Sequence, residues 1–230
     1  LHKIPYIMGF LSITNNNYWK NVEDFKFEDV FEREYQSNIR QKIKKICLKN
    51  KANPYLVGYT WTDAPRWDIE ISRATRGTDW VSSIRRLPGD CEGKKRYVNY
   101  LNEKYENDIC LFNKVYSLDA ISFNHLLSHD FSFIPNKNPK IVNDDKGFLN
   151  IISKEINWLV GDTIKKYDPN HLLFGERYLL RDHPLEVLNA SIEYVDVLTL
   201  QVGGGYHGKP WTLDDGIYDE LEFNEETFDR

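Results

Sequence analysis

Residues 54–67 read PYLVGYTWTDAPRW and join an apolar run directly to a polar and aromatic turn. The apolar part predicts a strand that is buried on both faces, as the strands of parallel sheets are. The turn follows at the carboxyl end of that strand, where barrel enzymes place their reactive groups. This stretch therefore indicates both a parallel sheet and the position of a functional site.

Three further apolar runs predict strands near residues 4–11, 171–175 and 195–201, each followed by polar or aromatic residues. Amphipathic stripes between them predict helices, with apolar residues at helical spacing over 31–46 and 148–167. The remaining regions give weaker signals. A helical stretch is predicted over 97–105 and a shorter helix over 185–190. Irregular structure is predicted for the Arg-rich residues 68–93, and a long loop for residues 128–146, which contain Pro and Asn.

Alternating strands and helices predict an α/β fold with parallel strands and right-handed crossover helices. An open doubly wound sheet and a closed (β/α)8 TIM-type barrel both fit this order. No GxGxxG follows the first strand and no GxxxxGK[ST] occurs, so support for a nucleotide-binding open sheet is missing. Long loops after the strands favour the barrel, of which we expect this chain to form a part.

Composition excludes several classes of partner. The formal net charge of −5 argues against nucleic acid, because phosphate binding needs clustered Lys and Arg. No apolar run approaches the roughly 20 residues that span a bilayer. No signal peptide is visible, since the chain opens with Leu-His-Lys, and the three cysteines lack metal-ligand spacing. We expect neither a metal nor another cofactor.

Residues at the carboxyl ends of barrel strands converge on one cleft, so these positions supply the candidate site. The two carboxylates are Asp63 and Glu176, and glycoside hydrolysis uses such a pair. Aromatic rings can stack on sugars, while amides, Arg and His can bind hydroxyls. The expected substrate-binding residues are Asn15, Trp19, Tyr59, Trp61, Arg66, Trp67, Arg177, Gln201, His207 and Trp211.

Structural interpretations of these residues remain open. An aspartate before Ala-Pro, as Asp63 is, often caps a turn. Glu176 and Arg177 are adjacent and can form a structural ion pair at the barrel mouth. A single tryptophan is more often a core residue than a sugar platform.

Several segments resemble clan-A glycoside hydrolases, especially the β-galactosidase-like and agarase-like ones. PYLVGYTWTDAPRW (54–67) is similar to their fourth-strand segment, and residues 96–126 are similar to the insertion that follows that strand. KKYDPNHLLFGERY (165–178) resembles their next helix and fifth strand, and YVDVLTLQ (194–201) their sixth. The resemblance covers nearly the whole chain, and the matching segments occur in the same order.

The resemblance implies a site and a register. Thr62-Asp63 stands where the family has Asn-Glu, which makes Asp63 the candidate acid/base, with one methylene fewer than the usual Glu. Glu176 is the second candidate carboxylate and would orient that acid or bind a hydroxyl. By this register the chain holds strands three to six, so the family's nucleophile and the remaining barrel would lie outside it. Residues 1–230 would then be a portion of the catalytic domain, with a long βα insertion at about 64–146.

The resemblance also implies a function: hydrolysis of a galactose-containing or agar-like polysaccharide or oligosaccharide, with a retaining mechanism. Such a substrate favours a secreted or periplasmic protein. The rival hypothesis is a non-catalytic carbohydrate-binding barrel, supported by the change from Asn-Glu to Thr-Asp.

Overall fold

A four-stranded parallel sheet forms the centre of the described structure. The computed structural model describes residues 3–9, 26–63, 66–128, 138–179 and 183–201. The strands are β1 (Tyr6–Gly9), β2 (Leu56–Asp63), β3 (Leu172–Leu179) and β4 (Thr199–Gln201), paired in the order β1-β2-β3-β4. The predicted parallel order of the four strands is confirmed.

The last two strands differ in length from the prediction. β3 continues four residues beyond the predicted Gly175, whereas β4 begins at Thr199 instead of residue 195. The backbone N–H groups of Asp196 and Val197 both donate to the carbonyl of Leu173, and the Asp196 carboxylate accepts the Leu173 N–H at 2.8 Å. These contacts satisfy the backbone before β4 in a turn-like arrangement, so ladder pairing starts later.

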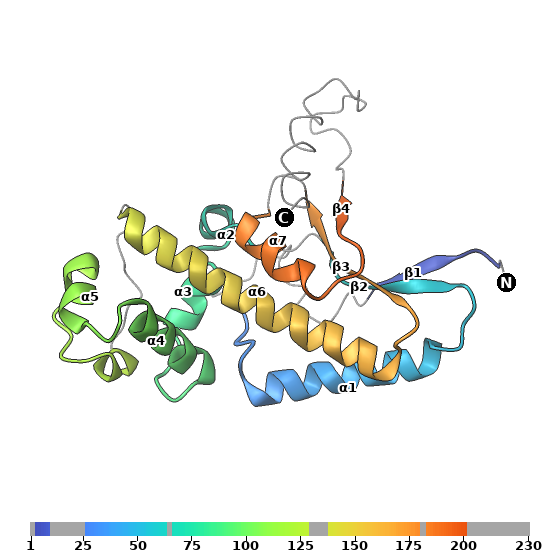
Figure 1. Cartoon of the computed structure of the whole chain (residues 1–230), viewed down its shortest axis with the longest axis horizontal. Coiled ribbons are helices and arrows are strands. Elements are labelled where there is room, and N and C mark those ends of the chain that lie inside the picture. The colour runs from blue at the N-terminus through green and yellow to red at the C-terminus, as the bar shows by residue number, and fades with distance from the viewer. Residues whose placement is uncertain (1–2, 10–25, 64–65, 129–137, 180–182, 202–230) are drawn as a thin grey trace, which may run out of the picture.

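Three helices cover one face of the sheet. These are α1 (Arg33–Asn50), α6 (Pro139–Tyr167) and α7 (Leu185–Ile192), and α6 runs along the length of the molecule beside both others (Figure 1). The apolar stripes predicted for α1 and α6 are buried, including Ile39 and Ile43 of α1 and Ile152 and Ile156 of α6. Burial of such stripes is the main source of helix stability in a folded protein.

A group of helices connects β2 to α6. Its members are α2 (Ile69–Arg76), α3 (Trp80–Arg85), α4 (Glu92–Lys104), α5 (Ile109–Tyr116) and the 3₁₀ turn η2 (Asn124–Leu127). The prediction of irregular structure over 68–93 is wrong. The carboxylates of Asp68 and Asp79 accept backbone N–H groups at the starts of α2 and α3, and Gly77 ends α2 with a left-handed φ of 70°. Caps at both ends define helices that are too short to show a clear apolar period.

The loop predicted over 128–146 is also wrong for its second part. α6 begins at Pro139, and the Asn138 side chain caps it by accepting the Lys140 N–H. Proline is well suited to the first turn of a helix, because its missing N–H has no intrahelical partner there. Residues 129–137 lie outside the described part of the chain.

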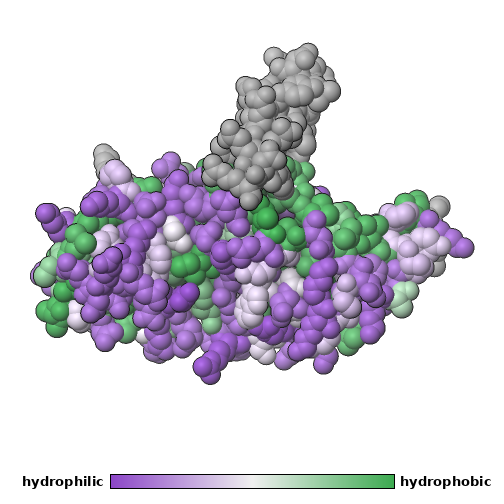
Figure 2. Space-filling view, in the orientation of Figure 1, coloured by the Kyte–Doolittle hydropathy of each residue, from purple (hydrophilic) through white to green (hydrophobic). Residues whose placement is uncertain are grey.

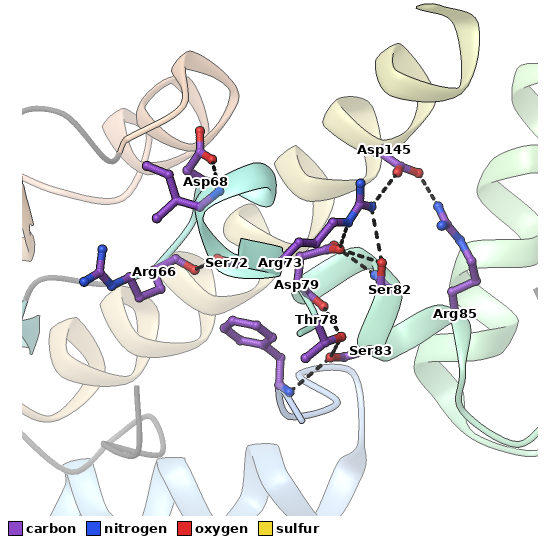
Figure 3. A network of polar contacts seen from close by, with 12 residues as sticks. Arg66, Asp68, Ser72, Arg73, Thr78, Asp79, Ser82, Ser83, Arg85 and Asp145 are labelled. Atoms are coloured by element: carbon purple, nitrogen blue, oxygen red, sulfur yellow. Dashed lines mark hydrogen bonds and ion pairs between the residues drawn. The ribbon is translucent and has the colours of Figure 1, made fainter. Parts of the chain in front are cut away.

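Buried ion pairs attach this helical group to α6. Asp145 of α6 accepts hydrogen bonds from Arg85 of α3 and, at 3.2 Å, from Arg73 of α2, and Arg73 also binds Asp79 at 2.5 Å (Figure 3). The neighbouring Asp144 accepts hydrogen bonds from two tyrosines of α4–α5 and an ion pair from Lys104. The group therefore has a fixed position on the amino-terminal half of α6.

The face of the sheet that points away from the helices carries exposed apolar side chains. Leu173 is buried beside Gly161 of α6, so its neighbour Leu172 points to the other face. Ile7 and Leu172 both pair in register with Gly58 and so share that face, where they are 45% and 41% exposed. Figure 2 shows apolar residues gathered over this part of the molecule.

At the amino-terminal end of the sheet, a buried carboxylate links strands to helices. Asp168 directly follows α6 and is fully buried. Its Oδ2 accepts a hydrogen bond from the Tyr59 hydroxyl of β2 at 2.6 Å, and His171 Nδ1 lies 2.8 Å from both carboxylate oxygens of Asp168. Burial raises the pKa of Asp168, but the hydrogen bonds from Tyr59 and His171 outweigh burial and hold the pKa below its ordinary value.

Asp168→Ala should lower the free energy of unfolding by about 1–3 kcal/mol at neutral pH, because it leaves buried donors without an acceptor. A carboxylate with a depressed pKa stabilises the fold above its unfolded-state value of 3.8, and the contribution is lost as pH falls through the folded-state pKa. The difference from wild type should therefore shrink in acid. Urea unfolding between pH 3 and 7 measures it, with the exposed Asp162→Ala of the same helix as control. An equal difference at all pH values would contradict this role.

Candidate functional site

An exposed ion pair lies at the carboxyl ends of β2 and β3. Asp63, the last residue of β2, pairs in register with Arg177 of β3. The Arg177 Nε donates to Asp63 Oδ1 at 2.8 Å, and its Nη2 donates to the same oxygen. The two side chains are 41% and 45% exposed, so a ligand can reach both. The sequence placed both residues in the site, but it did not predict this pairing.

Glu176, the second candidate carboxylate, is not exposed beside this pair. Its side chain is buried, with 1% of the residue exposed, and its Oε2 accepts the Trp67 indole N–H at 2.6 Å. Thr62 and Tyr178 lie next to the same carboxyl group. Burial raises the pKa of Glu176 to about 7, although these polar neighbours lower it.

Glu176 and Arg177 point to opposite faces because neighbouring strand residues do, and a backbone bulge decides that Glu176 is the buried one. Gly175 has a left-handed φ of 65°, and the β2–β3 register shifts at this point. Leu173 and Tyr178 are both buried, which an unbroken two-residue alternation does not allow. The interpretation of Glu176 and Arg177 as an ion pair with each other is therefore wrong, because Arg177 binds Asp63 on the other face.

The aromatic residues predicted to stack on sugars belong to the core. Tyr59, Trp61 and Trp67 are each at most 1% exposed. Trp67 stacks on Trp80 of α3, with ring centroids 4.9 Å apart and planes inclined by 18°. Trp67 is covered by α3, whereas Tyr59 is buried at Asp168 behind the sheet, and neither contact has a clear sequence signal.

The remaining predicted site residues divide into two groups. Arg66 is half-buried, its carbonyl accepts the Trp80 indole N–H at 3.1 Å, and its guanidinium points away from the ion-pair network in Figure 3. Gln201 ends β4, in backbone register with Leu179. Asn15, Trp19, His207 and Trp211 lie outside the described residues.

The sequence did not predict a hollow of about 420 Å³ between α2, α6 and the start of α7. Its walls combine apolar residues such as Ile69 and Leu185 with charged ones such as Arg73 and Asp145. Arg73 and Asp145 already bind each other there, so both help to hold the helices together. Only the folded positions of three helices create this hollow, and local sequence carries no signal for it.

Within the described ranges, no group of three or more His, Cys, Asp or Glu side chains is arranged to hold a metal ion. No described helix is long and apolar enough to cross a membrane.

The fold matches solved glycosidase structures. PfGH50B is 22% identical to this chain with a TM-score of 0.74, and the match covers 97% of this chain and 31% of PfGH50B. An exo-β-agarase is 19% identical with a TM-score of 0.74, and the match covers 97% of this chain and 30% of the agarase. The chain has the fold of part of a glycoside hydrolase barrel. A β-galactosidase from the Antarctic haloarchaeon Halorubrum lacusprofundi also matches, at 13% identity and a TM-score of 0.57, over 92% of this chain and 31% of its own.

These comparisons confirm the predicted (β/α)8 barrel class. The chain spans less than a third of the length of those three structures. No family model matches the chain, and no curated protein matches it.

Glu176 should make stability depend on pH near neutrality. An acid whose folded-state pKa is raised to about 7 from 4.5 stabilises the fold below pH 4.5, and this contribution is lost as pH rises to about 7. Glu176→Gln cannot ionise, so wild type should lose stability relative to this variant across that window. Urea unfolding at pH 4.5, 6 and 8 tests this, with Glu103→Gln on the exposed face of α4 as control. A constant difference over the three pH values would show that Glu176 does not titrate there.

Proposed function

We propose that this chain is part of a glycoside hydrolase that acts on a galactose-containing polysaccharide or oligosaccharide of the agar type. The observation that carries the proposal is the exposed Asp63–Arg177 pair at the carboxyl ends of β2 and β3. Active sites of (β/α)8 barrels lie at this end of the strands. The likeness of the fold to agarases and β-galactosidases supports the substrate class.

In the proposed reaction Asp63 is the acid/base. It protonates the glycosidic oxygen as the leaving group departs, and in the second step it removes a proton from the attacking water. A retaining mechanism also needs a carboxylate nucleophile on the other side of the scissile bond, and we assign it to a part of the barrel outside the described residues. Arg177 orients Asp63 and donates hydrogen bonds to sugar hydroxyls.

Further sugar contacts belong in this proposal to the other predicted site residues that are not buried in the core. We assign them to the side chains of Arg66 and Gln201, and to the four predicted residues outside the described ranges, Asn15, Trp19, His207 and Trp211. The buried Tyr59, Trp61 and Trp67 are not part of this set, because a side chain that is at most 1% exposed offers a ligand no surface.

The remaining strands of the barrel complete the proposed site. β1 and β4 are the two edges of the described sheet, and the exposed Ile7 and Leu172 lie on its face away from the helices. In a closed barrel this face is filled by side chains from the other strands. Residues 64–146, which contain α2 to α5, form a βα insertion of this barrel.

A second candidate function is carbohydrate binding without hydrolysis. The observation that favours it is the geometry at Asp63, whose Oδ1 accepts two hydrogen bonds from Arg177. A carboxylate held by a guanidinium fork is well suited to accept hydrogen bonds from hydroxyls, whereas an acid catalyst has to carry a proton.

Asp63→Asn distinguishes the two functions in the complete protein. An asparagine keeps the size and an acceptor oxygen but cannot transfer a proton. Turnover of unactivated agar oligosaccharides should fall about 10²- to 10⁴-fold, and turnover of activated aryl galactosides should fall much less, because a good leaving group needs little protonation. Initial rates on both substrates measure the two effects.

The control is Asp119→Asn, which changes an exposed aspartate between α5 and η2 and should leave both rates unchanged. Equal losses on the two substrates would assign Asp63 to binding. Binding of oligosaccharide by the wild type without release of reducing ends would support the second candidate.

Residues 1–230 as a separate polypeptide should show no glycosidase activity, because the proposed nucleophile is absent from the described site. Exposed strand edges and apolar side chains should also make this polypeptide self-associate. Light scattering measures association, and Leu172→Lys should reduce it, while Lys42→Ala on the exposed side of α1 should not. A monomeric 1–230 polypeptide that cleaves galactosides would contradict the proposed division of the barrel.

A further inference from the structure

Two adjacent residues of β3 hold the two ends of the connection that leaves β2. Arg177 binds Asp63, where β2 ends, at 2.8 Å. Glu176 binds the indole of Trp67, just before α2, at 2.6 Å. The two contacts lie on opposite faces of the sheet, because Arg177 is exposed and Glu176 is buried.

Trp67 transmits this contact to the backbone next to it. Its ring stacks on Trp80, and the Trp80 indole N–H donates to the carbonyl of Arg66 at 3.1 Å. Phe27 covers Trp80 with ring centroids 4.6 Å apart. Trp67 is therefore held against α3 on one side and β3 on the other, and the carbonyl of the neighbouring Arg66 is held by α3.

We propose that Glu176 is a positioning residue, which through Trp67 holds the backbone at residues 66–67 and so keeps Asp63 in reach of Arg177. This inference rests on the proposed carbohydrate site at Asp63. It gives the second predicted carboxylate a role that needs no contact with substrate. A group with 1% of its surface exposed cannot reach a glycosidic bond, but it can order the residues that do.

The surroundings of Glu176 support this role. Tyr35 of α1 and Tyr178 of β3 are the titratable groups beside it, and burial raises the pKa of both hydroxyls far above the ordinary value. They stay neutral at physiological pH. The Trp67 N–H donates to the carboxyl group, so Trp67 is bound whether Glu176 is protonated or charged.

The test compares Glu176→Gln with Glu176→Leu in the complete protein. Glutamine keeps an acceptor for Trp67, while leucine has a similar size and no acceptor. Binding of agaro-oligosaccharide is measured by calorimetry. Glu176→Leu should raise the dissociation constant tenfold or more, which corresponds to roughly 1.4 kcal/mol. The dissociation constant of Glu176→Gln should stay within about threefold of wild type. Trp67→Phe keeps an aromatic ring to stack on Trp80 but loses the indole N–H, so it should weaken binding as Glu176→Leu does. This variant tests the inference even if Glu176→Leu does not fold.

Two NMR signals keep the inference independent of sugar binding. The Trp67 indole N–H should lose its hydrogen-bonded chemical shift in Glu176→Leu and keep it in Glu176→Gln. The side-chain carboxyl carbon of Asp63, assigned with Asp63→Asn, should shift in Glu176→Leu and in Trp67→Phe. Glu155→Gln is the matched control, because Glu155 also accepts one side-chain hydrogen bond, from Gln36 at 2.7 Å between α1 and α6.

The outcomes separate the two proposals. An unchanged Asp63 signal in folded Glu176→Leu and Trp67→Phe would overturn the positioning role. Glu176→Gln as damaging as Glu176→Leu would also overturn it, because charge and not acceptance would then matter. Wild-type protein that binds no agaro-oligosaccharide would refute the proposed function, while the Asp63 signal would still decide the role of Glu176.

Discussion

Two neighbouring aspartates of α6 hold the helical group to the rest of the structure. Asp145 binds Arg73 and Arg85, and Asp144 binds Lys104 with two tyrosine hydroxyls. Taking such charges out of water is costly, and here every charge has a partner of opposite sign. Removal of one partner from a buried ion pair lowers the free energy of unfolding by about 3–5 kcal/mol, so a substitution of one of these residues alone is expected to destabilise the fold.

The position of this group determines the environment of the candidate site. α3 carries Trp80, on which Trp67 stacks, and α3 is held by the Arg85–Asp145 contact. α6 continues from that contact to Asp168 and then into β3, which carries Glu176 and Arg177. Trp67 and Arg177 are therefore both connected to α6, the first through α3 and the second through β3. We expect substitutions along α6 to affect the position of Asp63 even where they do not contact it.

Sequence patterns predicted the parts of the fold that repeat. Four apolar runs and two long amphipathic stripes are enough for the parallel order of β1 to β4 and for α1 and α6, because hydrophobic periodicity reports burial. α2 and α3 escaped prediction, since they are short and rich in Arg. Arg73 and Arg85 both bind Asp145, which is far along the chain, and local sequence does not reveal such contacts.

The strand-end positions of two candidate residues were predicted, but their contacts were not. Asp63 and Arg177 lie at the strand ends, as expected from barrel geometry. The burial of Glu176 and Trp67 depends on a bulge in β3 and on the helices after β2, neither of which changes the apolar pattern of 171–178. Residue types thus supplied the candidate residues, whereas which of them are accessible followed only from the backbone.

The left-handed Gly175 decides which sign of charge the site presents. A Cβ at this position would lie 2.8 Å from Val195 Cγ1, in addition to the cost of the left-handed φ. Without the bulge, the two-residue alternation of β3 would exchange its last residues between the faces, turning the carboxylate outward and the guanidinium into the core. In evolutionary terms, the loss or gain of one residue here would replace an exposed cation with an exposed acid without any change to Glu176 or Arg177 themselves. Related chains are therefore best compared at the backbone around this glycine before their charged residues are aligned.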